Sequence, residues 1–174
     1  MALSVCLLLD ERSDRAVRGL LRRLEDVGVP TLLSHTHRHH LPHLTFVSLV
    51  DYALDTVRGA LTELPARAPT PVRFDALGMF RRSRCWLGLA PSVDLLRRQR
   101  AVVDAVRHTG ATVHRSYEPD AWVPHLTLAP RLHLAQLPVV ARHAFEVLPV
   151  DATLDRAALV DTATGAVHPL PHVV

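Results

Sequence analysis

The hexapeptide Leu41-Pro42-His43-Leu44-Thr45-Phe46 returns further along the chain as Val123-Pro124-His125-Leu126-Thr127-Leu128. The two histidines are 82 residues apart, close to half of the 174-residue chain. One recurring tetrapeptide is weak evidence in a sequence with 12 histidines. The segments around the two copies therefore decide whether the chain contains a duplication.

The segment before each copy shows the same pattern. Residues 3–9 and 85–89 are short apolar runs that predict strands, and apolar residues at helical spacing follow each run. Gly28 and Gly110 end these helices, as expected for left-handed caps, and each lies 15 residues before its motif histidine. The predicted helices carry Val17, Leu20, Leu21, Leu24 and Val27 in the first half, and Leu95, Leu96, Val102, Val103 and Val106, after Ser92, in the second. The two halves share one register.

The repeat predicts an α+β fold with antiparallel sheets. Each half is expected to contain a strand, a helix, a second strand, the motif strand and a further helix. We predict one bilobal domain over residues 1–174, in which pseudo-two-fold duplicated αβ lobes, residues 1–64 and 84–143, flank a central cleft.

Proline and glycine positions divide the rest of the chain. Prolines in the segment 65–71 oppose helix and sheet interior, so the lobes are expected to cross near residues 65–83. C-terminal strands are expected over residues 144–170, with one candidate at Phe145-Glu146-Val147 and a hairpin that turns near Thr164-Gly165.

The composition excludes several kinds of chemistry. All 20 basic residues are arginine, so the chain has no lysine for a covalent nucleotide intermediate, a Schiff base or a lysine-bearing phosphate loop. The net charge of +3 is compatible with an anionic ligand. Cys6 and Cys85 are too few for a disulfide scaffold or a thiolate zinc site, and they are interpreted as small buried residues.

The N-terminal stretch and the hydropathy of the chain predict the cellular location of the protein. Residues 1–9 are apolar but lack a basic flank, and acidic residues follow at once, unlike a signal peptide. No apolar run approaches the length of a membrane span. We expect a cytoplasmic protein with no membrane partner and no obligate protein partner.

The His-x-Thr spacing favours acid–base chemistry. Side chains two apart on a strand share a face, so His43 with Thr45, and His125 with Thr127, should each line one side of a strand. Histidine can give or take a proton near neutral pH, and a threonine hydroxyl can donate a hydrogen bond to a phosphate oxygen. If the lobes bring both motifs together, the site could act on a phosphodiester without a metal.

The residues Pro42-His43-Leu44-Thr45-Phe46 and Pro124-His125-Leu126-Thr127-Leu128-Ala129 resemble the two-histidine phosphoesterase superfamily. Within it, the chain is similar to the bacterial RNA 2′,3′-cyclic phosphodiesterase or 2′-5′ RNA ligase family. Residues 76–80, which lead to the strand at 85–89, look like the central segment of that family. The resemblance covers most of the chain and weakens beyond about residue 145.

The resemblance implies a bilobal fold and a phosphoesterase that opens a 2′,3′-cyclic phosphate on RNA or a nucleotide, leaving a 2′-phosphate. His43 and His125 would be the catalytic residues, and Thr45 and Thr127 would bind the phosphate. Run backwards with a 5′-hydroxyl, the site would join RNA ends through a 2′-5′ linkage without ATP. No cofactor and no metal are expected, and the partner would be RNA or a nucleotide with a cyclic phosphate or a 2′-5′ linkage.

Other residues are candidates for substrate contacts. His40 aligns with Trp122 in the shared register, and either ring could stack on a base, as could Tyr117. The alternative is that Tyr117 and Trp122 are partly buried aromatics near a turn. Arg81, with Arg82 and Arg84, could reach a phosphate or could form a solvated surface.

Two other functions remain open from the sequence. His35, His37, His39 and His40 have the spacing of a metal site, which would make the protein a metallohydrolase, or else they form an exposed loop at the cleft mouth. A duplicated module that binds RNA or nucleotide phosphates without catalysis is the other alternative.

Overall fold

The computed structural model describes residues 3–174, which contain four α-helices, two 3-10 helices and eight strands. In chain order they are β1 (Leu3–Leu9), α1 (Glu11–Asp26), β2 (His43–Asp51), α2 (Leu54–Thr62), β3 (Thr70–Phe80), β4 (Arg84–Leu89), α3 (Val93–His108), β5 (Thr112–Val113), η1 (Arg115–Tyr117), β6 (His125–Ala129), η2 (Leu134–Gln136), α4 (Leu137–Phe145), β7 (Val150–Asp161) and β8 (Val167–Pro169). The predicted α+β class is confirmed.

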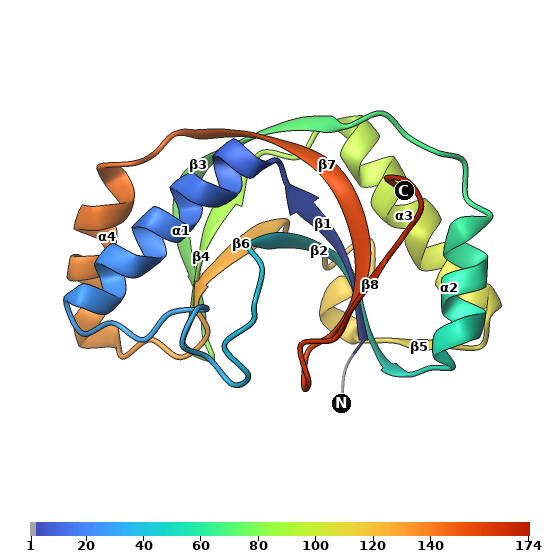
Figure 1. Ribbon diagram of the computed structural model, residues 1–174, viewed down its shortest axis with the longest axis horizontal. Helices are drawn as coiled ribbons and strands as arrows, with labels where there is room; N and C mark the ends of the chain where they lie inside the picture. The colour runs from blue at the N-terminus through green and yellow to red at the C-terminus, as the bar shows by residue number, and fades with distance from the viewer. Residues whose placement is uncertain (1–2) are drawn as a thin grey trace.

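All strand pairings are antiparallel, in the order β5-β2-β1-β7-β3-β4-β6, with β8 beside β7. The long strand β7 joins the two lobes, because its first part pairs with β3 and its remainder pairs with β1. Figure 1 shows the result as an arch of strands with a helix pair on each outer side. The motif strands β2 and β6 belong to different sides of this arch.

The helices pair across the two halves of the sequence. α1, from the first half, packs beside α4, from the second, and α2 packs beside α3 (Figure 1). The lobes expected as residues 1–64 and 84–143 therefore exchange a helix. The physical reason lies in the strand order, in which β7 separates β1 and β2 from β3 and β4. Each half of the sheet must bury its apolar face against helices, and each half receives two of them.

The helix boundaries follow their capping residues. The Asp10 side chain accepts a hydrogen bond from the Ser13 N–H at 3.0 Å, and Ser92 does the same for the Leu95 N–H at 3.1 Å. Gly28 and Gly110 have the predicted left-handed backbone, with φ of +80° and +82°. Of the predicted core positions, Val27 and Leu96 are wrong: they are 50% and 41% exposed, because Val27 lies beyond the last turn of α1 as its C-cap and Leu96 lies on the solvent side of α3.

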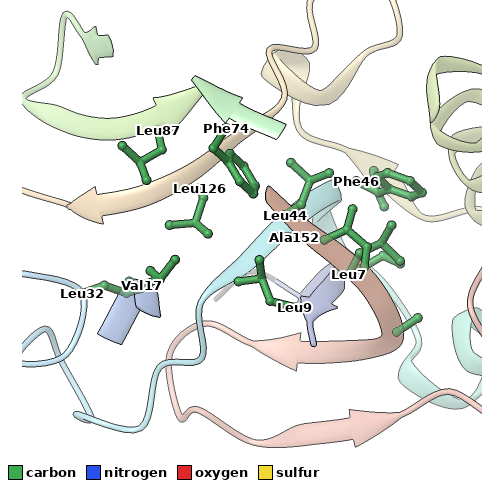
Figure 2. Close-up of a cluster of buried hydrophobic side chains, with 14 of the residues drawn as sticks. Leu7, Leu9, Val17, Leu32, Leu44, Phe46, Phe74, Leu87, Leu126 and Ala152 are labelled. Atoms are coloured by element: carbon green, nitrogen blue, oxygen red, sulfur yellow. The ribbon is translucent and has the colours of Figure 1, made fainter. Parts of the chain in front are cut away.

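The core lies between the sheet and its helices (Figure 2). Leu44 and Leu126, the residues between histidine and threonine in the two motifs, are fully buried, as is Phe46. Burying a leucine of this kind contributes about 1.5–3 kcal/mol, so Leu44→Ala would cost about 2–5 kcal/mol. The apolar side of each motif strand thus anchors the polar side.

Three predictions of local secondary structure can be compared with the observed backbone. The second strand expected between Gly28 and the first motif does not form: residues 29–42 are loop and turn, with Thr36 and Arg38 at positive φ. Phe145 ends α4 instead of starting a strand, since the C-terminal strands begin only at Val150. The predicted hairpin is confirmed: β7 and β8 turn at Gly165, with φ of +79°. In the described part of the chain, no helix has both the length and the apolar character needed to cross a membrane.

Candidate active site

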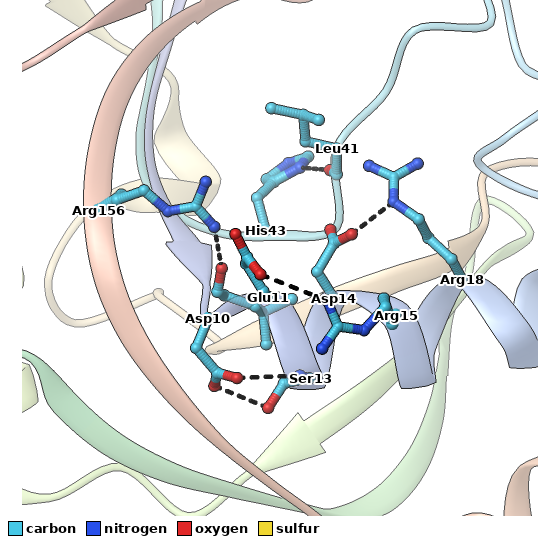
Figure 3. Close-up of polar contacts among 10 residues, drawn as sticks. Asp10, Glu11, Ser13, Asp14, Arg15, Arg18, Leu41, His43 and Arg156 are labelled. Carbon is cyan, nitrogen blue, oxygen red and sulfur yellow. Dashed lines mark hydrogen bonds and ion pairs between the residues drawn. The ribbon is translucent and has the colours of Figure 1, made fainter.

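Each motif histidine starts a strand, β2 or β6, and its ring is held in the same way. Nδ1 of His43 donates to the Leu41 carbonyl at 2.6 Å, and Nδ1 of His125 donates to the Val123 carbonyl at 2.7 Å (Figure 3 shows the first contact). A carbonyl can only accept, so the proton sits on Nδ1 and leaves Nε2 for chemistry. Both rings are therefore anchored through Nδ1 in the same way, and Nε2 is the nitrogen available for proton transfer.

The two motif strands approach each other although they are not paired. Cα atoms of β2 and β6 come within 8 Å. On the first side, the buried Gln99 amide donates to the carbonyls of Phe46, at 3.1 Å, and Tyr117, at 2.9 Å. On the other, the Leu32 N–H donates to the Leu128 carbonyl at 2.8 Å. These contacts tie each motif strand to the segments beside it.

A cleft of about 670 Å³ opens beside His125. Four arginines line it: Arg81, Arg82 and Arg84 from the β3–β4 turn, and Arg115 from η1. Within residues 3–174, none of the four forms an ion pair with a carboxylate, and no acidic side chain lines the cleft. Guanidinium groups bind phosphate in a fork geometry, so the cleft suits a phosphorylated ligand.

His125 is held in its neutral form. It is 8% exposed, and burial, together with the positive charges of Arg84 and His43, lowers its pKa to about 4. The Phe80 ring meets the imidazole edge to face, with centroids 4.9 Å apart, and the Trp86 ring lies 5.9 Å away. At neutral pH, His125 is therefore an acceptor for a proton.

His43 is held in its charged form. Burial lowers its pKa, but the Cys6 sulfur, by its charge and a hydrogen bond, and the Leu41 carbonyl raise it, to about 9 overall. His43 is not among the residues that line the cleft, although it is close enough for its charge to act on His125. A pair of imidazoles with pKa values on either side of neutrality can supply an acid and a base together.

The threonines differ in exposure. Thr45 is 8% exposed, whereas Thr127 is half-buried. The Tyr117 hydroxyl lies within hydrogen-bonding reach of Thr45, and burial raises the pKa of that tyrosine. Thr45 thus belongs to a buried polar group with Cys6 and Tyr117.

The predicted substrate contacts divide into two sets. Arg81 and Tyr117 line the cleft, and so do Arg82 and Arg84, which the sequence left open as a solvated surface. The expectation that Trp122 flanks the site as a stacking platform does not fit its position. Trp122 is 7% exposed, its ring meets Phe46 edge to face at 5.6 Å, and its N–H is bonded inside the core.

The histidine-rich loop stacks on itself. The rings of His37 and His40 are 3.9 Å apart, those of His35 and His40 are 5.7 Å apart, and Nε2 of His40 contacts the Thr36 hydroxyl at 2.8 Å. Burial, and the charges of His37, His35 and His43, lower the pKa of His40 to about 4. In the described part of the chain, no group of three or more histidine, cysteine or acidic side chains is arranged to hold a metal ion.

Several residues of the site were missed by the sequence reasoning. Phe80, His114 and Arg115 line the cleft, and Cys6 lies beside Thr45. Arg115 and His114 come from the segment before the second motif, where the short strand β5 and η1 had no periodic signal. Phe80 stands next to the arginine run, so its place at the β3–β4 turn is the one signal that could have found it.

A known protein family matches most of this sequence. The sequence model of the 2′-5′ RNA ligase superfamily matches residues 11–166. The chain belongs to that superfamily. No curated relative matches the sequence. The superfamily contains phosphoesterases and ligases, and membership supports a phosphoesterase activity for this chain.

Several solved structures share the fold of this chain at low sequence identity. Escherichia coli LigT in its apo form is 16% identical, with a TM-score of 0.64 over 97% of this chain and 94% of the other. A protein of Thermus thermophilus, TT0787, is 19% identical, with a TM-score of 0.60 over the whole of both chains. A structure described as a phosphoesterase is 16% identical, with a TM-score of 0.63 over 97% and 94% of the two chains.

Proposed function

We propose that this chain opens 2′,3′-cyclic phosphates on RNA or nucleotides to 2′-phosphates by two-histidine acid–base catalysis. One observation carries the proposal: two imidazoles with identical Nδ1 contacts have pKa values displaced in opposite directions, to about 9 for His43 and about 4 for His125. A hydrolysis that moves one proton in and one proton out needs such a pair.

The pKa values assign the roles. Nε2 of neutral His125 takes a proton from water, whose oxygen attacks phosphorus. The P–O3′ bond breaks, and the departing 3′ oxygen takes the proton from Nε2 of charged His43. Thr45 and Thr127 hold the non-bridging phosphate oxygens in line between the rings, and the cleft arginines offset the phosphate charge. Each imidazole contributes about 10²- to 10⁴-fold in rate.

The same ring opening would form a 2′-5′ bond if a 5′-hydroxyl attacked phosphorus in place of water, with the same P–O3′ bond breaking. The product is set by whether water or an RNA end occupies the attacking position. Structures of E. coli LigT with 3′-AMP and with ATP support a nucleotide as the occupant of such a cleft. The four arginines of the cleft, which no carboxylate pairs within residues 3–174, support it independently.

The test compares three variants on cyclic-phosphate substrates. His43→Ala and His125→Ala should each reduce turnover of 2′,3′-cyclic AMP and of cyclic-phosphate-ended RNA at least about 100-fold, while substrate binding and folding persist. His108→Gln, at the C-terminal end of α3, is the matched control and should leave the rate unchanged. Phosphorus NMR should identify the product as a 2′-phosphate.

Three results would overturn the proposal. Full turnover by either alanine variant would show that the histidines are not catalytic. Tight binding of the cyclic nucleotide by the wild type without any turnover would favour the alternative of a phosphate-binding module. A 3′-phosphate product would contradict the assignment of the leaving oxygen.

A further inference from the structure

Four consecutive residues, His114 to Tyr117, line one wall of the cleft beside His125. A second wall comes from the β3–β4 turn. In that turn the Phe80 ring contacts the His125 ring, with centroids 4.9 Å apart, and Arg84 stands opposite Phe80 in the strand register. The β3–β4 turn therefore lies next to the imidazole that would act on the phosphate, and the 114–117 wall is left for another part of a nucleotide.

The 114–117 wall is held in place by bonds to the first motif strand and within itself. The His114 N–H donates to the Ser48 carbonyl of β2 at 2.8 Å, and the Tyr117 N–H donates to the His114 carbonyl at 2.8 Å. The buried Gln99 amide donates to the Tyr117 carbonyl at 2.9 Å. The wall is thus formed before a ligand binds, so little ordering is needed on binding.

The His114 ring presents a hydrogen-bond donor. Its Nδ1 accepts a bond from the Ser116 N–H at 3.3 Å. A backbone N–H can only donate, so the ring hydrogen lies on Nε2, the nitrogen that this bond leaves free. Arg115, the next residue, adds guanidinium N–H groups that no carboxylate pairs in the described part of the chain. The wall therefore offers two neighbouring donors.

The same wall lacks a carboxylate acceptor. Glu118 and Asp120 follow in the sequence, but Glu118 forms an ion pair with Arg107 of α3. Asp120 lies 3.8 Å from Arg100 on the same helix. Among the described residues, no aspartate, glutamate, asparagine or glutamine side chain lines the cleft. A base at this wall is therefore recognised through its own acceptor atoms.

Guanine is the base whose edge matches two neighbouring donors. Its N7 and O6 are adjacent acceptors, whereas adenine places an amino donor beside N7, cytosine presents an amino donor, and uracil presents O4 alone on that edge. The cleft volume of about 670 Å³ is large enough for a purine nucleotide.

We propose that His114 and Arg115 are specificity-determining residues that bind N7 and O6 of guanine. The cleft then selects guanosine 2′,3′-cyclic phosphate, or an RNA end that carries it, over the other three nucleotides. This inference rests on the proposed function, because the reacting phosphate beside His125 places the base of the same nucleotide within the cleft.

The experiment measures binding of 2′-nucleotides, the products of the proposed reaction, to the full-length protein by isothermal titration calorimetry. 2′-GMP should bind at least about 10-fold more tightly than 2′-AMP, 2′-CMP or 2′-UMP, as expected for a pair of matched acceptors. 2′-IMP keeps N7 and O6 but lacks the 2-amino group, so it should bind like 2′-GMP. The 7-deaza analogue of 2′-GMP lacks N7 and should bind more weakly than 2′-GMP.

Two variants remove the donors one at a time. His114→Phe keeps a ring without the Nε2 donor, and Arg115→Lys keeps the charge without the guanidinium fork. Each should reduce the ratio of 2′-GMP to 2′-AMP affinity at least about fivefold. Arg82→Gln, in the β3–β4 turn, is the matched control: it should weaken every nucleotide and leave the ratio unchanged. If His114→Phe does not fold, His114→Asn, whose side-chain oxygen can still accept from the Ser116 N–H, takes its place.

Equal affinity of the wild type for 2′-GMP and 2′-AMP overturns the inference, as does an unchanged ratio in both the His114 and the Arg115 variants. Hydrolysis gives a separate reading, in which kcat/KM for the guanosine cyclic phosphate should exceed that for the adenosine compound by a similar factor. If the wild type binds 2′-GMP selectively and hydrolyses no cyclic phosphate, the proposed function fails and the base selectivity stands. If it hydrolyses all four cyclic nucleotides equally, the selectivity fails and the proposed function stands.

Discussion

The indole N–H of Trp122 donates a hydrogen bond to the backbone carbonyl of Thr45 at 2.9 Å. Trp122 lies just before the second motif, and Thr45 is the threonine of the first, so the two halves of the chain are joined at the motifs themselves. The bond is buried, and its removal leaves a carbonyl without this donor. Trp122 therefore holds β2 rather than a substrate base.

Trp122→Phe should lower the free energy of unfolding by about 1–3 kcal/mol, because the Thr45 carbonyl loses a buried donor. Urea denaturation followed by circular dichroism measures the change. KM for a cyclic nucleotide should stay close to the wild-type value. A raised KM with unchanged stability would instead return Trp122 to the role of a stacking platform.

The rate should depend on pH through both imidazoles. His125 must be neutral, so kcat/KM should fall as pH drops through about 4, and His43 must be charged, so it should fall as pH rises through about 9. Between these limbs the profile should be flat. A stopped assay with 2′,3′-cyclic AMP measures it, and a profile with no acidic limb would contradict the base role of His125.

Arg84→Gln should move the acidic limb to higher pH, because the positive charge of Arg84 lowers the pKa of His125 in the wild type. KM should rise as well, since one phosphate-binding charge is lost, and its dependence on salt should weaken. Arg82→Gln, which removes a neighbouring cleft arginine, is the control: it should raise KM with no shift of the limb. Equal shifts in both variants would mean that net charge alone is responsible.

Activity should survive exhaustive treatment with EDTA, because both proton transfers are assigned to imidazoles. The competing interpretation places a metal on His35, His37, His39 and His40. The paired control replaces His37 and His39 by alanine in the same assay. Loss of activity on chelation, restored by added zinc, would favour the metallohydrolase.

Asp10→Ala should destabilise the fold by about 1–2 kcal/mol through loss of the α1 cap. The carboxylate accepts bonds from the Ser13 hydroxyl, at 2.8 Å, and from the Thr153 N–H, at 2.7 Å (Figure 3 shows the first). Burial raises its pKa, but these bonds outweigh burial and lower it to about 2. The stability that they give should be present above about pH 4 and lost as pH falls through about 2. Asp10→Asn, which keeps an acceptor oxygen, should lose less.

The repeat in the sequence predicted most of the fold. Strand β1, helices α1 to α3, the cap glycines and the β7–β8 hairpin all follow from apolar spacing and turn residues. The exchange of helices between lobes was not predictable, because periodicity shows which face of a helix is buried and not which sheet covers it. The second strand expected before the first motif was wrong, because positive φ at Thr36 and Arg38 turns the chain there, whereas the loop that the sequence allowed for His35 to His40 is what forms.

The site was predictable in part. The spacing of His43 with Thr45 and of His125 with Thr127 indicated a shared face in each motif, and of these four residues only His125 lines the cleft. The opposed pKa values depend on cross-strand neighbours that lie far away in sequence. Cys6 looked like any small apolar residue in a buried strand, and only the register places its sulfur at Thr45.

The crossing of α1 to the side of α4, and of α3 to the side of α2, makes the two sequence halves mutually dependent. A fragment that ends near residue 80 would carry β1 and β2 without α3, and would leave α1 with no companion. We expect either piece alone to aggregate, and the two co-expressed pieces to reassemble into an active heterodimer. Because each half of the duplicated sequence packs its helices against those of the other half, neither half is expected to fold and function alone.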